Sequence, residues 1–76
     1  MFEILIVSVN KNNGEIVYNM KNNFAEVYVA HITEDSIITI NSQPATLDDI
    51  NENSFEQPAE IRLNSTGNIV TRLNII

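Results

Sequence analysis

β-branched residues are the feature that most constrains how this chain can fold. Isoleucine, valine and threonine supply 23 of the 76 residues, whereas alanine and leucine supply only 4 each. β-branched side chains are stiff at χ1, so they suit a pleated sheet and crowd a helix. The sequence therefore predicts a mainly β protein rather than a helical bundle. The length allows one domain, spanning residues 1–76.

Apolar stretches separated by polar turns predict about six short antiparallel strands, over residues 2–9, 15–20, 24–32, 36–40, 59–64 and 68–76. The Asn13-Gly14 pair is a strong hairpin signal, because both residues tolerate positive φ angles. The first strand is apolar on both faces, which is typical of a covered strand. We therefore expect a small barrel or a curved sheet.

One short helix is predicted near residues 46–53. Thr46 is followed by Leu47, Asp48 and Asp49, and a hydroxyl followed by acids favours a helix N-terminus. Pro58 prevents a helix from continuing past this region.

Catalysis is not indicated by the residues present. The chain has no cysteine and a single histidine, and its serines and glycines form neither a nucleophile elbow nor a phosphate-binding loop. His31 lies between apolar residues, so we expect a half-buried strand histidine bonded to a neighbour. A domain of this size also has little room for a substrate cleft. The sequence thus predicts a protein that is not an enzyme and has no catalytic residue.

A partial calcium-loop pattern is present in the spacing of Asp49, Asn51, Asn53 and Glu60. The sixth position of that loop needs glycine but is Ser54, and Pro58 contradicts the flanking helix. We therefore expect no metal ligands and no cofactor.

Acidic residues are segregated along the chain. The net charge is −6, yet residues 33–60 contain seven acids and no lysine or arginine. These candidate partner-binding residues are Glu34, Asp35, Asp48, Asp49, Glu52, Glu56 and Glu60. If the helix reached Glu56, three of them (Asp49, Glu52 and Glu56) would form a stripe along one face. One interpretation is that the acids only keep surface turns soluble. The other is an acidic face that docks on a basic surface and makes association salt-dependent.

Three functional hypotheses follow. The first is a non-catalytic protein-binding module. Such a module would be an inhibitor encoded by a phage or mobile element, and it would act by occupying the basic, nucleic-acid-binding surface of a partner protein. The second is a homo-oligomeric assembly protein that pairs through the apolar terminal strands 2–9 and 68–76. The third is a small-barrel nucleic-acid-binding domain, with Lys21, Arg62 and Arg72 as a local positive patch. Four basic residues in all make nucleic acid a disfavoured partner.

The apolar start of the chain, residues 1–7, is too short to span a membrane and lacks the basic flank of a signal peptide. Together with the absence of cysteine, this favours a cytoplasmic location, which is the host cytoplasm for a phage-encoded protein. No membrane partner is expected.

Overall fold

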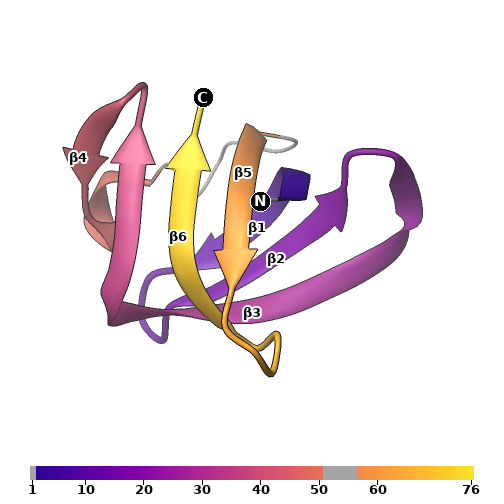
Figure 1. Cartoon of the computed structure of the whole chain (residues 1–76), viewed down its shortest axis with the longest axis horizontal. Coiled ribbons are helices and arrows are strands. Elements are labelled where there is room, and N and C mark those ends of the chain that lie inside the picture. Colours follow the sequence, from indigo (N-terminus) through magenta and orange to yellow (C-terminus); the bar gives the residue numbers. More distant parts are fainter. Residues whose placement is uncertain (1, 51–56) are drawn as a thin grey trace.

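A computed structural model describes residues 2–50 and 57–76 of the chain. These residues form one mixed sheet of six strands, and the predicted mainly β fold is confirmed (Figure 1). The strands are β1 (Phe2–Asn10), β2 (Glu15–Met20), β3 (Asn23–Ile40), β4 (Gln43–Ala45), β5 (Gln57–Leu63) and β6 (Ile69–Ile75).

The sheet curls into a barrel-like ring that is not evenly closed. β1 lies between β2 and β5, β6 lies between β5 and β3, and additional pairing of β2 with β3 completes the ring. β4 extends the sheet beyond β3. All pairs are antiparallel except β3 and β6, which run parallel. The expectation of antiparallel strands throughout is thus corrected at one pair, which joins strands far apart in sequence.

β3 is one 18-residue strand where the sequence analysis expected two strands and a turn. The polar residues near Thr33 form an irregularity within the strand, since the register with β6 shifts between Ile32 and Ile37. Ser36 holds this bend, because its Oγ accepts from the Thr33 N–H at 2.9 Å and donates to the Val70 carbonyl. The first part of β3 can therefore pair with β2, and the second part with β6 and β4.

Two tight turns place the short strand β4 and the start of β2. Asn41 and Ser42 both have positive φ angles, of 52° and 66°, and connect β3 to β4 as a two-residue hairpin. The predicted turn at Asn13-Gly14 is confirmed between β1 and β2, with a φ of 75° at Gly14. An ideal Cβ on Gly14 would lie 2.3 Å from the Ile32 carbonyl oxygen, so this turn packs directly on the backbone of β3.

The predicted helix is reduced to a single 3₁₀ turn, η1 (Leu47–Asp49). Its start follows the prediction, because the Asp49 carboxylate accepts the Thr46 backbone N–H at 2.8 Å. Its end does not, because Ile50 is already extended, with a ψ of 131°. The side chain of Ile50 is 3% exposed and joins the core, and this burial ends the turn.

A single apolar cluster fills the interior of the ring. Isoleucines dominate it, and the largest fully buried side chains include Tyr18, Ile4, Ile16 and Ile61. His31 lies on the outer face of β3 with a side chain that is 48% exposed, close to the expected half-buried position, and its Nε2 is 4.0 Å from Oε2 of Glu15 on β2. Within residues 2–50 and 57–76, no helix is long and apolar enough to cross a membrane.

Candidate protein-binding face

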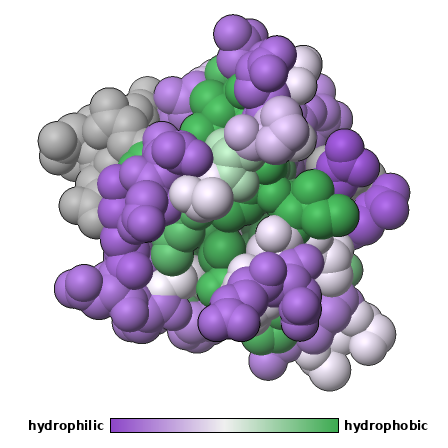
Figure 2. Space-filling model, turned by 90° about the vertical axis from the view of Figure 1, so that its left-hand side faces the viewer, coloured by the Kyte–Doolittle hydropathy of each residue, from purple (hydrophilic) through white to green (hydrophobic). Residues whose placement is uncertain are grey.

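Two apolar depressions lie on either side of η1. The larger, which we call the hollow, is open, measures about 830 Å³, and is bounded by the β1–β2 turn, the bend of β3 and the β4–η1 connection. Its apolar lining comes from Ile32, Ile38, Ala45 and Leu47. Figure 2 shows the side of the molecule on which β4 lies, where apolar atoms occupy the centre and hydrophilic residues frame them. An apolar centre with a polar rim is the usual anatomy of a protein interface.

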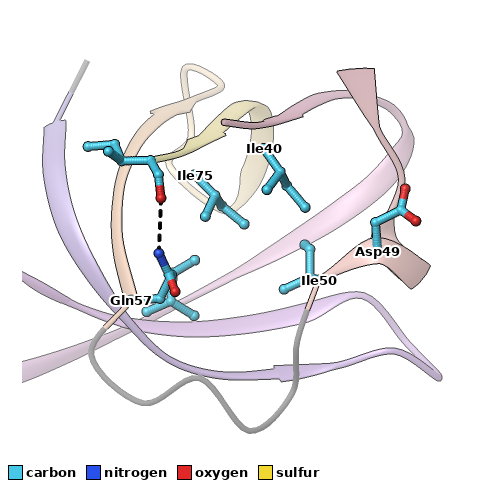
Figure 3. A pocket seen from close by; sticks show the side chains of 7 residues that line it. Ile40, Asp49, Ile50, Gln57 and Ile75 are labelled. Carbon is cyan, nitrogen blue, oxygen red and sulfur yellow. Dashed lines mark hydrogen bonds between the residues drawn. The ribbon is translucent and has the colours of Figure 1, made fainter. Parts of the chain in front are cut away.

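The smaller depression, which we call the isoleucine pocket, has a volume of about 200 Å³ and is lined by Ile6, Ile40, Asp49, Ile50, Gln57, Ile75 and Ile76. Ile40, Ile50 and Ile75 point toward one another across it (Figure 3). Gln57 closes one wall, because its Nε2 donates to the Ile76 carbonyl at 3.2 Å. Five separate segments of the described chain therefore build this pocket.

Four of the seven predicted partner-binding acids lie on or beside these depressions. Glu34 lines the hollow together with Thr46 and Leu47 at the start of η1. Asp48 and Asp49 lie on η1 itself, between the hollow and the isoleucine pocket. Asp35 follows Glu34 at the β3 bend and is exposed, with its N–H bonded to Thr33 Oγ1 at 3.3 Å. The fold thus joins the bend of β3 to η1 at one side of the molecule.

The other three acids are not brought to this face. Glu60 lies on β5, in register with Glu3 of β1, and accepts a hydrogen bond from Asn74 Nδ2 at 3.2 Å. It lines a different depression, with Phe2 and Lys21. Glu52 and Glu56 lie outside the described residues. A helical stripe that includes them requires a helix that reaches Glu56, whereas the helical turn that begins at Leu47 ends before Ile50.

Two of the acidic side chains on this face differ in what surrounds them. The Asp49 carboxylate is tied to the backbone by Thr46, whereas that of Asp48 has no partner among the described residues. Lys11 lies across the mouth of the hollow, and its Nζ donates to the Asp48 backbone carbonyl at 3.0 Å. This contact braces the β1–β2 turn against η1.

The remaining cations lie elsewhere. Lys21 forms a salt bridge with Glu3 at 3.7 Å, so it is not grouped with the arginines. Arg62 and Arg72 face each other on β5 and β6, and both are exposed. The positive patch expected from all three residues is therefore limited to the arginine pair.

The two tyrosines stack on each other, with ring centroids 5.7 Å apart. Tyr18 is 2% exposed, so it cannot supply the partner contact that an exposed tyrosine would make. Burial raises the pKa of the Tyr18 hydroxyl. The pKa of Tyr28 is also raised, chiefly because its hydroxyl donates a hydrogen bond to the Glu26 carboxylate.

The isoleucine pocket is small and has few polar groups in its lining. The isoleucine pocket is below the size typical of small-molecule sites, about 300–1,000 Å³. Its one carboxylate, that of Asp49, already accepts hydrogen bonds from Thr46. In the part of the chain that the structure describes, no three metal-ligating side chains come together.

Comparisons with protein-family models, with curated proteins and with solved structures found no match to this chain. The interpretation of this face consequently depends on its own geometry.

Sequence reasoning did not find the apolar half of the face. Ile40, Ile50 and Ile75 were expected as ordinary core or strand positions, and no spacing in the sequence connects them. The signal that could have been used is indirect. Successive side chains of a strand point to opposite faces, so the apolar pair Ile75-Ile76 cannot be buried on both. Ile75 lies in the core, and Ile76 is 70% exposed at the edge of the pocket.

Proposed function

We propose that this chain is a non-catalytic protein-binding module that docks its acidic face on a basic surface of a partner protein. The observation that carries the proposal is the position of η1. Its two aspartates stand between two apolar depressions, one of which is also lined by Glu34. We call this surface, made of the hollow, η1 and the isoleucine pocket, the acidic face.

The composition of the acidic face supports binding to a protein rather than to solvent alone. Charges that serve only solubility are interspersed over a surface and need no apolar neighbour. Here the acids frame apolar concavities, so a partner would gain both burial of apolar area and complementary charge. Of the described residues that line the hollow, Lys11 alone is basic, and it contacts a backbone carbonyl.

A strongly basic partner surface is commonly one that binds nucleic acid, because phosphate contacts need lysine and arginine. A small acidic module on such a surface acts as a competitive inhibitor. This is the role we assign to the chain, and it fits a phage or mobile-element product acting in its host.

The proposal is tested by capture of partners with two matched variants. Glu34→Gln, Asp35→Asn and Asp48→Asn together remove three charges from the acidic face. Glu3→Gln, Glu15→Gln and Glu60→Gln remove three charges from other surfaces. We expect wild type to capture partners at low salt and to release them at high salt. The first variant should fail to capture these partners and the second should still capture them. Added nucleic acid should compete for the same partners. Equal capture by both variants would contradict the proposal.

The two alternatives are less well supported by the fold. Self-assembly through the terminal strands needs a free strand edge, but β1 lies between β2 and β5, and β6 lies between β5 and β3. Nucleic-acid binding by a small barrel usually combines a basic groove with exposed aromatic rings on which bases stack. Among the described residues, Tyr18 is buried beneath Tyr28, and the cations that face each other are limited to the pair Arg62 and Arg72.

A further inference from the structure

We infer that the pair Asn13-Gly14 is a modification site that the fold keeps closed. When the β1–β2 turn opens, this pair converts to isoaspartate, and the modified chain can no longer pack the turn on β3. The inference concerns the turn alone, so it does not depend on the proposed function. It follows from the contacts of Gly14 and from the chemistry of an asparagine that precedes a glycine.

The reaction joins the backbone nitrogen of Gly14 to the side-chain carbon Cγ of Asn13. The backbone nitrogen loses its proton, the new C–N bond forms, and the side-chain nitrogen leaves as ammonia. The product is a five-membered succinimide ring. Water then adds to one of the two ring carbonyls and opens the ring, which gives aspartate or isoaspartate. Water is the one co-reactant, and no atom is oxidised or reduced.

Asn13 is the asparagine of this chain that is best suited to this reaction. Asparagine occurs 12 times, but glycine follows it only once. A side chain on the following residue crowds the attacking nitrogen, whereas glycine leaves it open and gives the backbone more conformations. Asn13 is also exposed, so water reaches its carboxamide. The unfolded chain should therefore react at this pair first.

The attacking nitrogen is held in the folded chain. The N–H of Gly14 donates to the Asn10 carbonyl at 2.8 Å, and Gly14 is buried. A buried and hydrogen-bonded N–H exchanges its proton only when the structure around it opens. The fold therefore blocks the first step at the nucleophile, although the side chain of Asn13 stays accessible.

Gly14 also cannot shift toward the side chain that it must attack. Its carbonyl accepts the Ile32 N–H at 2.7 Å, and an ideal Cβ on Gly14 would lie 2.3 Å from the Ile32 carbonyl oxygen. The Oδ1 of Asn13 is engaged as well, because it accepts the Glu15 N–H at 2.9 Å. Both reacting groups are therefore fixed in the folded turn.

Isoaspartate does not fit the space that the fold provides. Its main chain runs through the former side chain, which adds one methylene group to the backbone before Gly14. Gly14 has no free space toward Ile32, and its φ of 75° is set by the turn. The longer backbone must displace Gly14 from Ile32 or open the hairpin, and either change costs stability. Chains that react while open are thus removed from the folded population.

The first test compares deamidation of the full chain at neutral pH with and without urea, followed by peptide mapping with mass spectrometry. In urea we expect Asn13 to react before the other asparagines. In the folded chain we expect Asn13 to react at least about a hundredfold more slowly, because the reaction then waits for the turn to open. Folded and unfolded rates that agree within about threefold would overturn the inference.

Two matched lysine variants test whether opening of this turn limits the reaction. Lys11→Ala removes the bond from Lys11 Nζ to the Asp48 carbonyl, which braces the turn against η1. Lys21→Ala removes a lysine from the connection between β2 and β3. In the folded chain the first variant should speed the reaction at Asn13 about fivefold, as expected for loss of one hydrogen bond, and the second should not change it. Equal rates for the two folded variants would contradict local opening.

The product itself is tested against Asn13→Asp. This variant carries the same new charge as isoaspartate but keeps the normal backbone, and its carboxylate can still accept the Glu15 N–H. We expect its urea midpoint to lie within about 0.5 M of wild type, and that of the purified isoaspartate chain to lie at least about 1 M lower. Equal midpoints for the two chains would show that the longer backbone fits the turn, and the inference would be wrong.

Discussion

Replacement of Gly14 by alanine tests the packing of the β1–β2 turn on β3. The φ of Gly14 is 75°, a left-handed conformation that costs an L-residue about 1–2 kcal/mol. The added Cβ would also lie 2.3 Å from the Ile32 carbonyl oxygen, which is a backbone atom and cannot rotate away. The backbone must therefore move at a place where the Ile32 N–H donates to the Gly14 carbonyl at 2.7 Å.

The expected cost of Gly14→Ala is the sum of these effects. Overpacking typically costs about 1–3 kcal/mol, and disturbance of the backbone hydrogen bond costs about 1 kcal/mol more. Together with the φ penalty of about 1–2 kcal/mol we expect a loss of about 3–6 kcal/mol. A chain of 76 residues has a free energy of unfolding of about 4–11 kcal/mol, so this single methyl group removes a large part of it.

Gly67→Ala is the matched control. Gly67 has nearly the same φ, 78°, but no heavy atom lies within 4 Å of an ideal Cβ there. Only the conformational penalty applies, and the lower backbone entropy of alanine in the unfolded chain offsets part of it, so we expect a loss of about 1 kcal/mol. The difference between the two variants isolates the close approach to β3.

Urea denaturation of the two variants measures that difference, followed by circular dichroism and analysed by linear extrapolation. We expect Gly14→Ala to be at least about 2 kcal/mol less stable than Gly67→Ala, which corresponds to roughly 8 °C or more in Tm for a domain of this size. Losses that agree within about 0.5 kcal/mol would refute the packing of Gly14 on the backbone of Ile32.

Three further substitutions or titrations probe other parts of the fold. Ser42→Gly should raise the free energy of unfolding by about 0.5–1 kcal/mol in urea denaturation. Glycine avoids the left-handed penalty at a φ of 66°, and its larger loss of backbone entropy offsets only part of this gain. A lower stability would contradict the two-residue turn. Tyr18 and Tyr28 have pKa values raised above their unfolded value of about 10, so the stability linked to them is fully present below that pH and is lost as pH rises through their folded pKa values. The tyrosinate absorbance should therefore rise with a midpoint above pH 10, with Tyr28→Phe isolating the signal of Tyr18. A midpoint at or below pH 10 would count against this arrangement. Arg72→Glu should stabilise the protein by about 0.5–1 kcal/mol in a thermal melt at low salt, because it places an opposite charge across from Arg62. The double variant with Arg62→Glu restores like charges at this pair, so it should show no gain in stability.

All strands except β4, which was not predicted, could be predicted from the sequence, because they depend on local alternation and on turns with a recognisable chemistry. The prediction of the β1–β2 hairpin from Asn13-Gly14 is correct, although only Gly14 of the pair has a positive φ, of 75°. The polar stretch after Ile32 was misassigned as a turn. Its hydroxyl groups instead support a bend within β3, and the bond from Ser36 to the Val70 carbonyl joins residues 34 positions apart. No local pattern contains that information.

The extent of the helix was mispredicted for a similar reason. The start of η1 depends on Thr46 and Asp49, which are three residues apart, and the sequence shows them. Its end depends on where Ile50 is buried, and that is set by strands that are distant in sequence. Tertiary packing therefore determined the length of the element, while local capping determined only where it begins.

The acidic segment shows how charge that is contiguous in sequence becomes separated in space. From the bend of β3 through β4 to η1 the chain turns back on itself within a few residues, so Glu34, Asp35, Asp48 and Asp49 stay on one side of the ring. β5 then pairs with β1, which carries Glu60 into register with Glu3.

Residues 33–60 contain seven acids, but a single partner surface cannot contact all of them at once. The chain segment that brings four of these acids together also places Leu47 in the hollow and Ile50 in the isoleucine pocket. A partner recognised by charge alone would tolerate neutralisation anywhere on the surface in proportion to the charge removed. A partner recognised by this face must respond to Asp48 and not to Glu60, although both are single carboxylates on the same chain. Affinities of Asp48→Asn and Glu60→Gln for one captured partner decide between these two cases.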